Sequence, residues 1–490
     1  MTNLITQLLE ELGPGHMAST AYDTAWAARL GEIEPEISNH SLCWLAENQL
    51  PDGSWGAPAP LYYHDRVLST LAAMIALTYH GRREHDKAQI EKGRLALEQI
   101  VGNATTGLQA DPNGATVGFE MIAPVLAEEA ERLGLIKNQR DRILGRLSQM
   151  RAKKLAYLQG KTINRCVTMA FSAEMAGSDG QHMLDIENLQ ESNGSVGTSP
   201  SATAYFAAYI RPGDPPALNY LRKVINPDGG MPNVAPFDVF ETAWALWNLS
   251  LIPGLNYTEK LKSHLEFLSN TWEPKRGVAF STAYSVKDSD DTVVTYNALL
   301  RFGIEKDLAS VLAYEEEDHF RCFDLEANPS ISTNIHILDA FLHAGFGRNN
   351  ASVQKVLGFL HRSRDRQFPF WADKWHASPY YATAHAIIAC AGVENELVAE
   401  SVEWILKTQN RSGAWGAYLP TAEETAYALQ ALWVWDQKAG RVPRSALLNG
   451  ARWLKENLDL PYPPLWIGKC LYSPTLVVRS AVISALALTG

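Results

Sequence analysis

Apolar positions recur along the chain at helical spacing, in segments that short glycine-rich turns separate. Three of these segments, at 241–246, 291–294 and 424–429, begin with an acidic residue and continue with small or apolar residues. Alternation of apolar and polar residues with a period of two, which is typical of strands, is almost absent. The pattern therefore predicts a protein made of α-helices.

A glycine-tryptophan phrase recurs between these helices. Residues 45–56 read LAENQLPDGSWG and residues 405–416 read ILKTQNRSGAWG, with looser copies at 191–201, 226–233 and 272–280. Glycine allows a tight turn, Asp or Thr caps the next helix, and the Gln and Trp side chains can tie helix ends together. Helical hairpins that cannot bury their apolar faces alone must stack, so the repeats predict an all-α fold of double-layered α-helical (α/α) barrels.

A length of 490 residues exceeds one ordinary core and indicates two domains. Residues 251–256 (LIPGLN) interrupt two helical blocks, and we expect the division there. Residues 110–114 (ADPNG) predict a further turn between helices.

Composition narrows the class of protein. Hydrophobic residues make up 46% and charged residues 20% of the chain, as in a soluble globular protein. A net charge of -11 argues against nucleic acid or an anionic membrane as the main partner. Five scattered cysteines without a CxxC pair fit a reducing cytosol. No signal peptide and no run of 18 apolar residues is present, so we expect a cytoplasmic protein without membrane insertion; the oligomeric state has no signal.

The candidate chemistry lies at residues 288–291, Asp-Ser-Asp-Asp, directly before the apolar Val293 and Val294. Taken alone, such a cluster is more typical of a solvated loop. If any of the carboxyl groups is buried, repulsion and desolvation keep at least one of them protonated near neutral pH. A protonated carboxyl group in a dry site can act as a Brønsted acid.

Together these motifs resemble the class II (protonation-initiated) terpene cyclases. QLPDGSWG, the DxDD motif at 288–291 and QNRSGAWG fall in the order and spacing of that family, and AYDTAWAARL (21–30), PSISTNIHIL (329–338) and DKWHASPYYATAH (373–385) are similar to bacterial diterpene cyclases. Squalene-type cyclases share the motifs but are longer. The resemblance implies a β domain (1–30 plus 255–490), which carries DxDD, an inserted γ domain (31–254), and an active cavity between them.

The resemblance also implies residue roles. Asp290 is expected to be the general acid that protonates the terminal alkene of a geranylgeranyl chain. Asp288 and Asp291 are expected to hold its conformation and its proton, and Asn334 is expected to hydrogen-bond to it directly or through water.

A carbocation needs stabilisation that is not nucleophilic, and a desolvated aromatic face supplies roughly 2 kcal/mol. Trp371, Trp375, Tyr380 and Tyr381 are candidate walls of the substrate cavity, although each can equally be a core residue.

The head group of the substrate is a separate question. Relatives that act on geranylgeranyl diphosphate carry a Glu-Asp pair, linked to Mg²⁺, where this chain has His64 and Asp65. Because Mg²⁺ prefers oxygen ligands, the histidine favours a substrate without diphosphate, such as a prenylated aromatic acid, and thus a meroterpenoid (merosterolic acid synthase-like) cyclase. The alternative is Mg²⁺-assisted cyclisation of geranylgeranyl diphosphate to a copalyl- or halimadane-type diphosphate. Protonation itself needs no cofactor.

Other classes fit less well. A class I terpene synthase needs DDxxD, but residues 292–295 after Asp290 and Asp291 include no distal Asp. Cys322 lies near His319 and His336 in sequence, yet nothing makes these three a zinc ligand set, so we expect no metal site. A non-catalytic helical-repeat scaffold remains an alternative, but it does not explain why three carboxyl groups adjoin an apolar helix.

Overall fold

The computed structural model describes residues 1–490 except 14, 16, 82, 104–114, 138–142, 144–146, 157, 159, 325, 327, 459 and 460. The turn expected at 110–114 lies outside the described residues. Helices of the first half are α1 (Thr2–Glu11), α2 (Ala21–Ala28), η1 (Gly31–Ile33), α3 (Pro35–Glu47), α4 (Tyr63–His80), α5 (Glu84–Asn103), α6 (Phe119–Arg132), α8 (Leu147–Ala156), η3 (Thr168–Ala176), η4 (Gln181–Met183), η5 (Ile186–Asn188), α9 (Pro200–Tyr205), η6 (Phe206–Ile210) and α10 (Pro215–Val224).

The second half contains helices and two short strands. These elements are α11 (Asp238–Ser250), α12 (Glu259–Thr271), α13 (Ser289–Arg301), α14 (Ala309–Leu312), α15 (Ile331–His343), α16 (Ala351–Ser363), α17 (Pro379–Cys390), α18 (Asn395–Thr408), α19 (Ala422–Lys438), α20 (Arg444–Glu456), β1 (Trp466–Ile467), β2 (Leu471–Tyr472) and α21 (Thr475–Thr489). The expectation of an all-α fold is confirmed.

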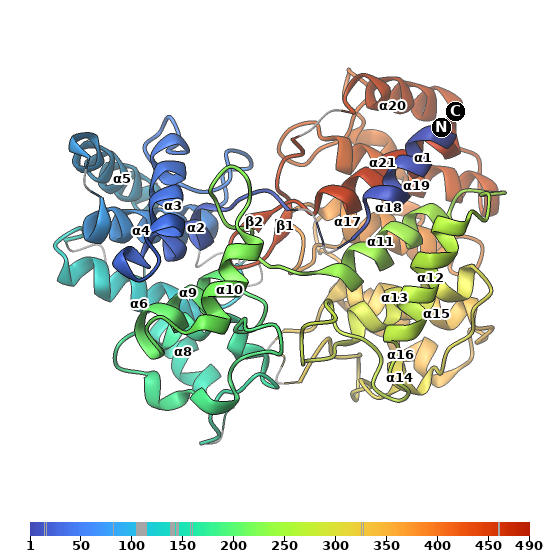
Figure 1. Cartoon of the computed structure of the whole chain (residues 1–490). Coiled ribbons are helices and arrows are strands. Elements are labelled where there is room, and N and C mark those ends of the chain that lie inside the picture. The colour runs from blue at the N-terminus through green and yellow to red at the C-terminus, as the bar shows by residue number, and fades with distance from the viewer. Residues whose placement is uncertain are drawn as a thin grey trace.

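Two helical barrels lie side by side (Figure 1). In one of them α11, α13, α15, α17, α19 and α21 contact each other in sequence order, and α21 returns to α11, so the inner ring is closed. Helices α12, α14, α16, α18 and α20 pack outside this ring, and α1, from the N-terminus, packs there against α21. We call this unit the acid barrel because α13 carries the DxDD motif.

The other barrel is smaller. Its inner ring runs through α2, α4, α6, η3 and α9 and closes between α9 and α2, while α3, α5, α8 and α10 pack outside. Each barrel has its own apolar core, and we call this second unit the N-terminal barrel.

This packing moves both domain boundaries that the sequence predicted. Helix α2 was placed with residues 1–30 of the β domain, but Tyr22 and Trp26 belong to the core of the N-terminal barrel. Helix α11 was placed in the inserted domain, but Trp244 and Trp247 belong to the core of the acid barrel. Residues 251–256 looked like a domain boundary because they interrupt two helices. They connect the inner α11 to the outer α12 of one barrel, and we therefore propose domains of 1–13 plus 238–490 and of 20–231.

The glycine-tryptophan phrases act as the sequence predicted. The indole N–H of Trp55 donates to the carbonyl of Leu45 at 2.8 Å, and that of Trp415 donates to Ile405 at 2.7 Å, one helix back. The amide of Gln409 donates to Gly413 O (2.8 Å) within the turn and to Ala446 O (2.9 Å) of the outer helix α20. Gly413 has a φ of +96°, which favours glycine. These bonds fasten successive helical hairpins to each other.

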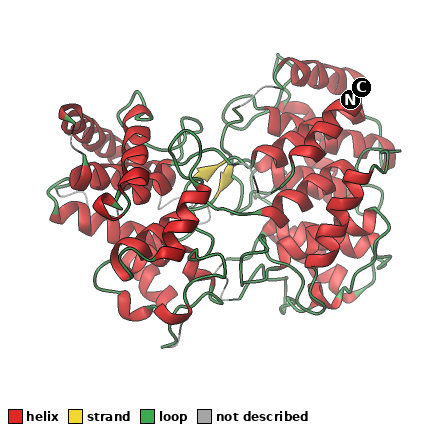
Figure 2. Cartoon of the chain, viewed as in Figure 1, coloured by secondary structure: helices red, strands yellow, loops and turns green. Residues whose placement is uncertain are grey.

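One β-hairpin lies between the barrels (Figure 2, yellow). Strands β1 and β2 pair antiparallel, with Trp466 opposite Tyr472 and Ile467 opposite Leu471. The hairpin belongs to the acid barrel in sequence, yet Cys470 at its tip packs in the core of the N-terminal barrel.

Candidate active site

The acidic cluster, Asp288, Asp290 and Asp291, opens helix α13. Asp288 is the N-cap in an extended conformation, and its carboxylate accepts the backbone N–H of Asp291 at 2.8 Å. Acidic residues at this position are favourable because the N-terminal N–H groups of a helix lack partners. Relative exposures are only 9%, 8% and 7%, so the three residues do not form a solvated loop. The condition for a Brønsted acid, a buried carboxyl group, is met.

Burial changes the proton affinity of the cluster. It raises the pKa of Asp291 well above its usual range, and the charges of Asp288 and Asp290 raise it further. The pKa of Asp288 rises to about 7, chiefly through burial, although the hydrogen bond from the Asp291 N–H opposes the rise. The Oδ1 atom of Asp291 is buried without a hydrogen-bond partner among the described residues. At neutral pH the cluster therefore holds protons rather than three negative charges.

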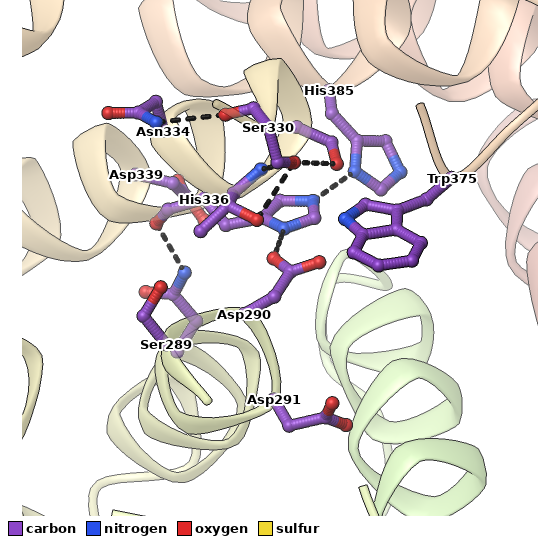
Figure 3. Close-up of polar contacts among 12 residues, drawn as sticks. Ser289, Asp290, Asp291, Ser330, Asn334, His336, Asp339, Trp375 and His385 are labelled. Atoms are coloured by element: carbon purple, nitrogen blue, oxygen red, sulfur yellow. Dashed lines mark hydrogen bonds and ion pairs between the residues drawn. The ribbon is translucent and has the colours of Figure 1, made fainter. Parts of the chain in front are cut away.

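Asp290 begins a row with two histidines that the sequence motifs did not assign to the site. Its Oδ1 lies 2.7 Å from Nδ1 of His336 on α15, and Nε2 of His336 lies 2.7 Å from Nδ1 of His385 on α17 (Figure 3). Both histidines are buried. These residues lie on three successive inner helices, so the packing of α13 against α15 and of α15 against α17 brings them together.

The structure corrects the role expected for Asn334. Its amide donates to the carbonyls of Phe320 (2.9 Å) and Ser330 (2.8 Å), and its Oδ1 accepts the N–H of Phe320 at 2.9 Å. Residues two positions apart on a helix point about 200° apart, so Asn334 and His336 cannot both face Asp290. His336 faces the acid, and Asn334 fixes the neighbouring loop. The phrase PSISTNIHIL at 329–338 contains His336 as well as Asn334, so the sequence did hold a signal for the histidine.

His385 is electrically neutral in this setting. Burial lowers the pKa of its imidazole well below the usual range, and His336 lowers it further. The ring of Trp247 lies 4.5 Å away from that of His385. Nε2 of His336 therefore faces the ring nitrogen of a neutral imidazole rather than a second cation.

Asp290 lines an apolar cavity of about 200 Å³ between the barrels. Aromatic side chains dominate the walls: Phe171, Phe237, Phe240, Trp244, Phe280, Tyr284, Phe323, Trp375, Trp466 and Tyr472. A second hollow of about 300 Å³ shares Trp375 and Phe323 with it and adds Lys153, Lys154 and Lys374. An apolar chain and an anionic group could thus lie in adjoining spaces.

One of the four wall candidates lines this cavity. Trp375 contributes to both hollows. Tyr380 is buried against Trp404, with ring centroids 4.7 Å apart. Tyr381 lies behind the wall and accepts the indole N–H of Trp244 at 3.1 Å.

Trp371 belongs to the core. Its indole N–H donates to Leu360 O at 2.9 Å, and its backbone N–H donates to the Thr383 hydroxyl at 3.0 Å. Trp55 and Trp415 make the same pair of bonds, to a carbonyl and to a threonine of the next inner helix. Trp371 thus has the structural role of the tryptophan in the glycine-tryptophan phrases. The glycine is missing before Trp371, so the sequence did not identify this residue as part of the repeat.

His64 and Asp65 do not fit a Mg²⁺ site. Burial lowers the pKa of His64 to about 4, and its ring stands edge-on to Phe119 at 4.8 Å. The Asp65 carboxylate accepts the N–H groups of Ala57 (2.6 Å) and Leu471 (3.4 Å). Within the described part of the chain, no group of three or more His, Cys, Asp or Glu side chains is arranged to hold a metal.

The described helices include none that combines the length and the apolar character needed to cross a membrane. The structure places the five cysteines apart, each as a free thiol.

Comparisons with known proteins agree with this geometry. No family model matches the chain. It is 46% identical over 484 residues to the type B diterpene cyclase of Mycobacterium tuberculosis, which covers 97% of this chain and 96% of that protein. It is 29% identical over 513 residues to an ent-copalyl diphosphate synthase of a Streptomyces species, and the match covers 97% of this chain and 93% of that protein. The solved ent-copalyl diphosphate synthase from Streptomyces platensis superposes with a TM-score of 0.81 at 29% identity, covering 100% and 98% of the two chains.

The fold and these relatives place the chain in the class II terpene cyclases, so it is an enzyme and the scaffold alternative is wrong. Within that class it belongs with the diterpene cyclases.

Proposed function

We propose that Asp290 protonates the terminal alkene of a geranylgeranyl chain and so starts its cyclisation. The observation that carries this proposal is the position of Asp290, which lines an apolar cavity while its Oδ1 lies 2.7 Å from His336 Nδ1. Because Oδ1 is engaged by the imidazole, we assign the transferred proton to Oδ2.

The surrounding residues suit this step. An alkene is a very weak base, so the acid must be free of competing water. The apolar walls of the cavity exclude that water. Loss of the proton leaves a carboxylate on Asp290, which an N–H at His336 Nδ1 stabilises. A protonated Asp291 adds no second negative charge beside it. The faces of Phe240, Trp244 and Trp466 supply cation–π stabilisation to the carbocation.

We assign Asp288 a holding role. It caps α13 and accepts the Asp291 N–H at 2.8 Å. This bond fixes the first turn of the helix and so the direction in which the Asp290 side chain projects from it. Asp288 and Asp291 therefore orient and neutralise, while Asp290 donates.

For the head group we propose a diphosphate. The Streptomyces relative is named for a copalyl diphosphate product, and Lys153, Lys154 and Lys374 line the hollow that adjoins the cavity. Ammonium groups bind phosphate oxygens as point charges. Lys154 and Lys374 already pair with Glu120 and Glu326, so a diphosphate would share them with these carboxylates.

A second candidate keeps the substrate that His64 favoured in the sequence, a geranylgeranylated aromatic acid. It is supported by the poor fit of His64 and Asp65 to Mg²⁺, since such a substrate needs no metal for its head group. On either substrate the protonation step requires no metal.

The two candidates differ in one assay. The purified protein is incubated with geranylgeranyl diphosphate or with a geranylgeranylated hydroxybenzoate, each with Mg²⁺ or with excess chelator, and products are identified by mass spectrometry. We expect a cyclised diphosphate that still forms in chelator. Cyclised benzoate without turnover of the diphosphate would establish the second candidate, and absence of cyclised product from both substrates would overturn the proposal.

A further inference from the structure

The β-hairpin carries a buried charge that the cyclisation chemistry does not use. Lys469, at the tip between β1 and β2, has a relative exposure of 0%. Its ammonium donates to Glu174 Oε1 (2.7 Å), Ser199 Oγ (2.7 Å) and Ser201 Oγ (2.8 Å). All three partners belong to the N-terminal barrel, whereas Lys469 is part of the chain that builds the acid barrel.

The tip makes further bonds across the same boundary. The carbonyl of Gly468 accepts the N–H of Val117 at 2.8 Å, and the Leu471 N–H donates to Asp65 at 3.4 Å. Asp65 thus holds the hairpin, at the position where relatives that act on geranylgeranyl diphosphate carry a Mg²⁺-linked Glu-Asp pair.

The base of the hairpin is anchored in the acid barrel. The indole N–H of Trp466 donates to Glu423 on α19 at 2.7 Å, and the Ile467 N–H donates to Trp375 O at 2.9 Å. The hairpin therefore bridges the two barrels through hydrogen bonds at both of its ends. Figure 2 shows its two strands between the barrels.

The same hairpin is a wall of the cavity. Trp466, Ile467, Gly468 and Tyr472 line it on the hairpin side, and Asp290 lines it from α13. Lys469 does not line the cavity, but its ammonium lies 4.6 Å from the ring of Phe171, which does. Lys469 thus contacts the wall of the cavity from behind, through Phe171.

A buried ammonium is a demanding anchor. Taking it out of water is costly unless a carboxylate and further acceptors surround it, so displacement of the tip would separate charges in an apolar interior. An apolar side chain at the tip could slide, whereas Lys469 has one position in which its three bonds are made.

We propose that Lys469 is a positioning residue that pins the hairpin to the N-terminal barrel and thereby sets the cavity shape that selects the cyclisation product. This rests on the proposed function. Because a carbocation reacts with whichever group lies nearest, a small shift of the Trp466 wall changes which ring closes and which proton is lost.

The test compares products. Lys469→Met removes the charge at similar length, and the double variant Lys469→Met/Glu174→Gln also removes the carboxylate that would be left unpaired. Lys469→Arg keeps the charge. The control is Lys355→Met, which breaks a Lys–Glu pair of 2.8 Å to Glu315 away from the cavity. Products are quantified by mass spectrometry at equal conversion, with kcat and KM measured separately.

We expect the double variant to fold and to lose the native product by at least threefold in favour of other cyclised products, while substrate consumption changes much less. Lys469→Arg should restore part of the native pattern, and Lys355→Met should match the wild type. A folded double variant with native products and native kinetic constants would overturn the proposal, even if it unfolds at lower temperature.

Hydrogen exchange provides a readout that needs no turnover. In Lys469→Met/Glu174→Gln the amides of residues 466–472 should exchange faster, with those of α13 unchanged; native exchange in the hairpin would also overturn the proposal. Failure of the proposed function is distinct, because then the wild type itself yields no cyclised product.

Discussion

Each barrel buries a cluster of carboxyl groups, and the two clusters are neutralised in different ways. In the N-terminal barrel Asp23 and Glu174 are buried near the ammonium of Lys469. In the acid barrel Asp288, Asp290 and Asp291 form no ion pair with any described Lys or Arg, and Asp290 meets only the imidazole of His336.

The difference teaches what each cluster can do. An ammonium neutralises a carboxylate without a proton, and the ion pair between Lys469 and Glu174 holds segments of the two barrels together. A cluster without a cation must be neutralised by protons, as the raised pKa values of Asp288 and Asp291 show, and a proton can be given to a substrate. The same residue type thus provides a structural anchor in one barrel and an acid in the other.

Removing the transferable proton should have the largest effect. Asp290→Asn keeps the shape of the side chain, so the protein should fold, but turnover should fall by at least ~10³-fold in a cyclisation assay. Asp179→Asn, an exposed aspartate on the N-terminal barrel, is the matched control and should be neutral. Near-native turnover of Asp290→Asn would end the assignment of the acid.

Removing the imidazole should cost less. His336→Ala takes away the partner of the Asp290 carboxylate, and a hydrogen bond to a charged group is worth about 10- to 100-fold in turnover. His336→Gln keeps a donor and should lose less. The control is His343→Ala, near the end of the same helix, where the ring pairs with Asp339 instead. Equal kinetics for His336→Ala and His343→Ala would show that the imidazole does not serve the acid.

Mutating the flanking carboxyl groups should give non-additive losses. Asp288→Asn and Asp291→Asn should each reduce turnover less than Asp290→Asn, because these residues orient and neutralise. The double variant should lose less than the product of the two single effects, since the group acts as a unit. Multiplicative losses in steady-state kinetics would instead indicate independent roles.

The smallest expected effect is on stability. A pKa of about 7 for Asp288 exceeds the unfolded value of about 3.9, so the folded state binds more protons between these values. The contribution of this group to the free energy of unfolding is therefore greatest below pH about 4 and falls as the pH rises to about 7. Asp288→Asn, an equally good N-cap, should flatten that fall in urea titrations.

The N-terminal barrel provides the comparison for that measurement. The pKa of Asp23 rises to about 6 through burial, with Lys469 opposing the rise, so its contribution should be lost over the narrower range from about 4 to about 6. Asp23→Asn should flatten only that range. If Asp288→Asn leaves the curve above pH 6 unchanged, Asp288 does not hold a proton there.

The sequence by itself determined the all-α fold, the repeat turns and the identity of the acidic cluster. These features are local: helical spacing, a glycine that permits a positive φ, and an N-cap that begins a helix all act within a few residues. The resemblance to class II cyclases rested on the same short motifs, which do not depend on how distant helices pack. The structure and the relatives confirmed it.

Only the tertiary structure decided which side chains meet. His336 reaches Asp290, and His385 reaches His336, because α13 packs against α15 and α15 packs against α17, and no local pattern records which helices pack together. The wall residue Trp466 and the anchor Lys469 lie on a hairpin that crosses to the other barrel. Trp371 and Trp375 stand four residues apart, yet one is core and the other faces the cavity, because burial depends on what packs opposite a side chain rather than on its own identity.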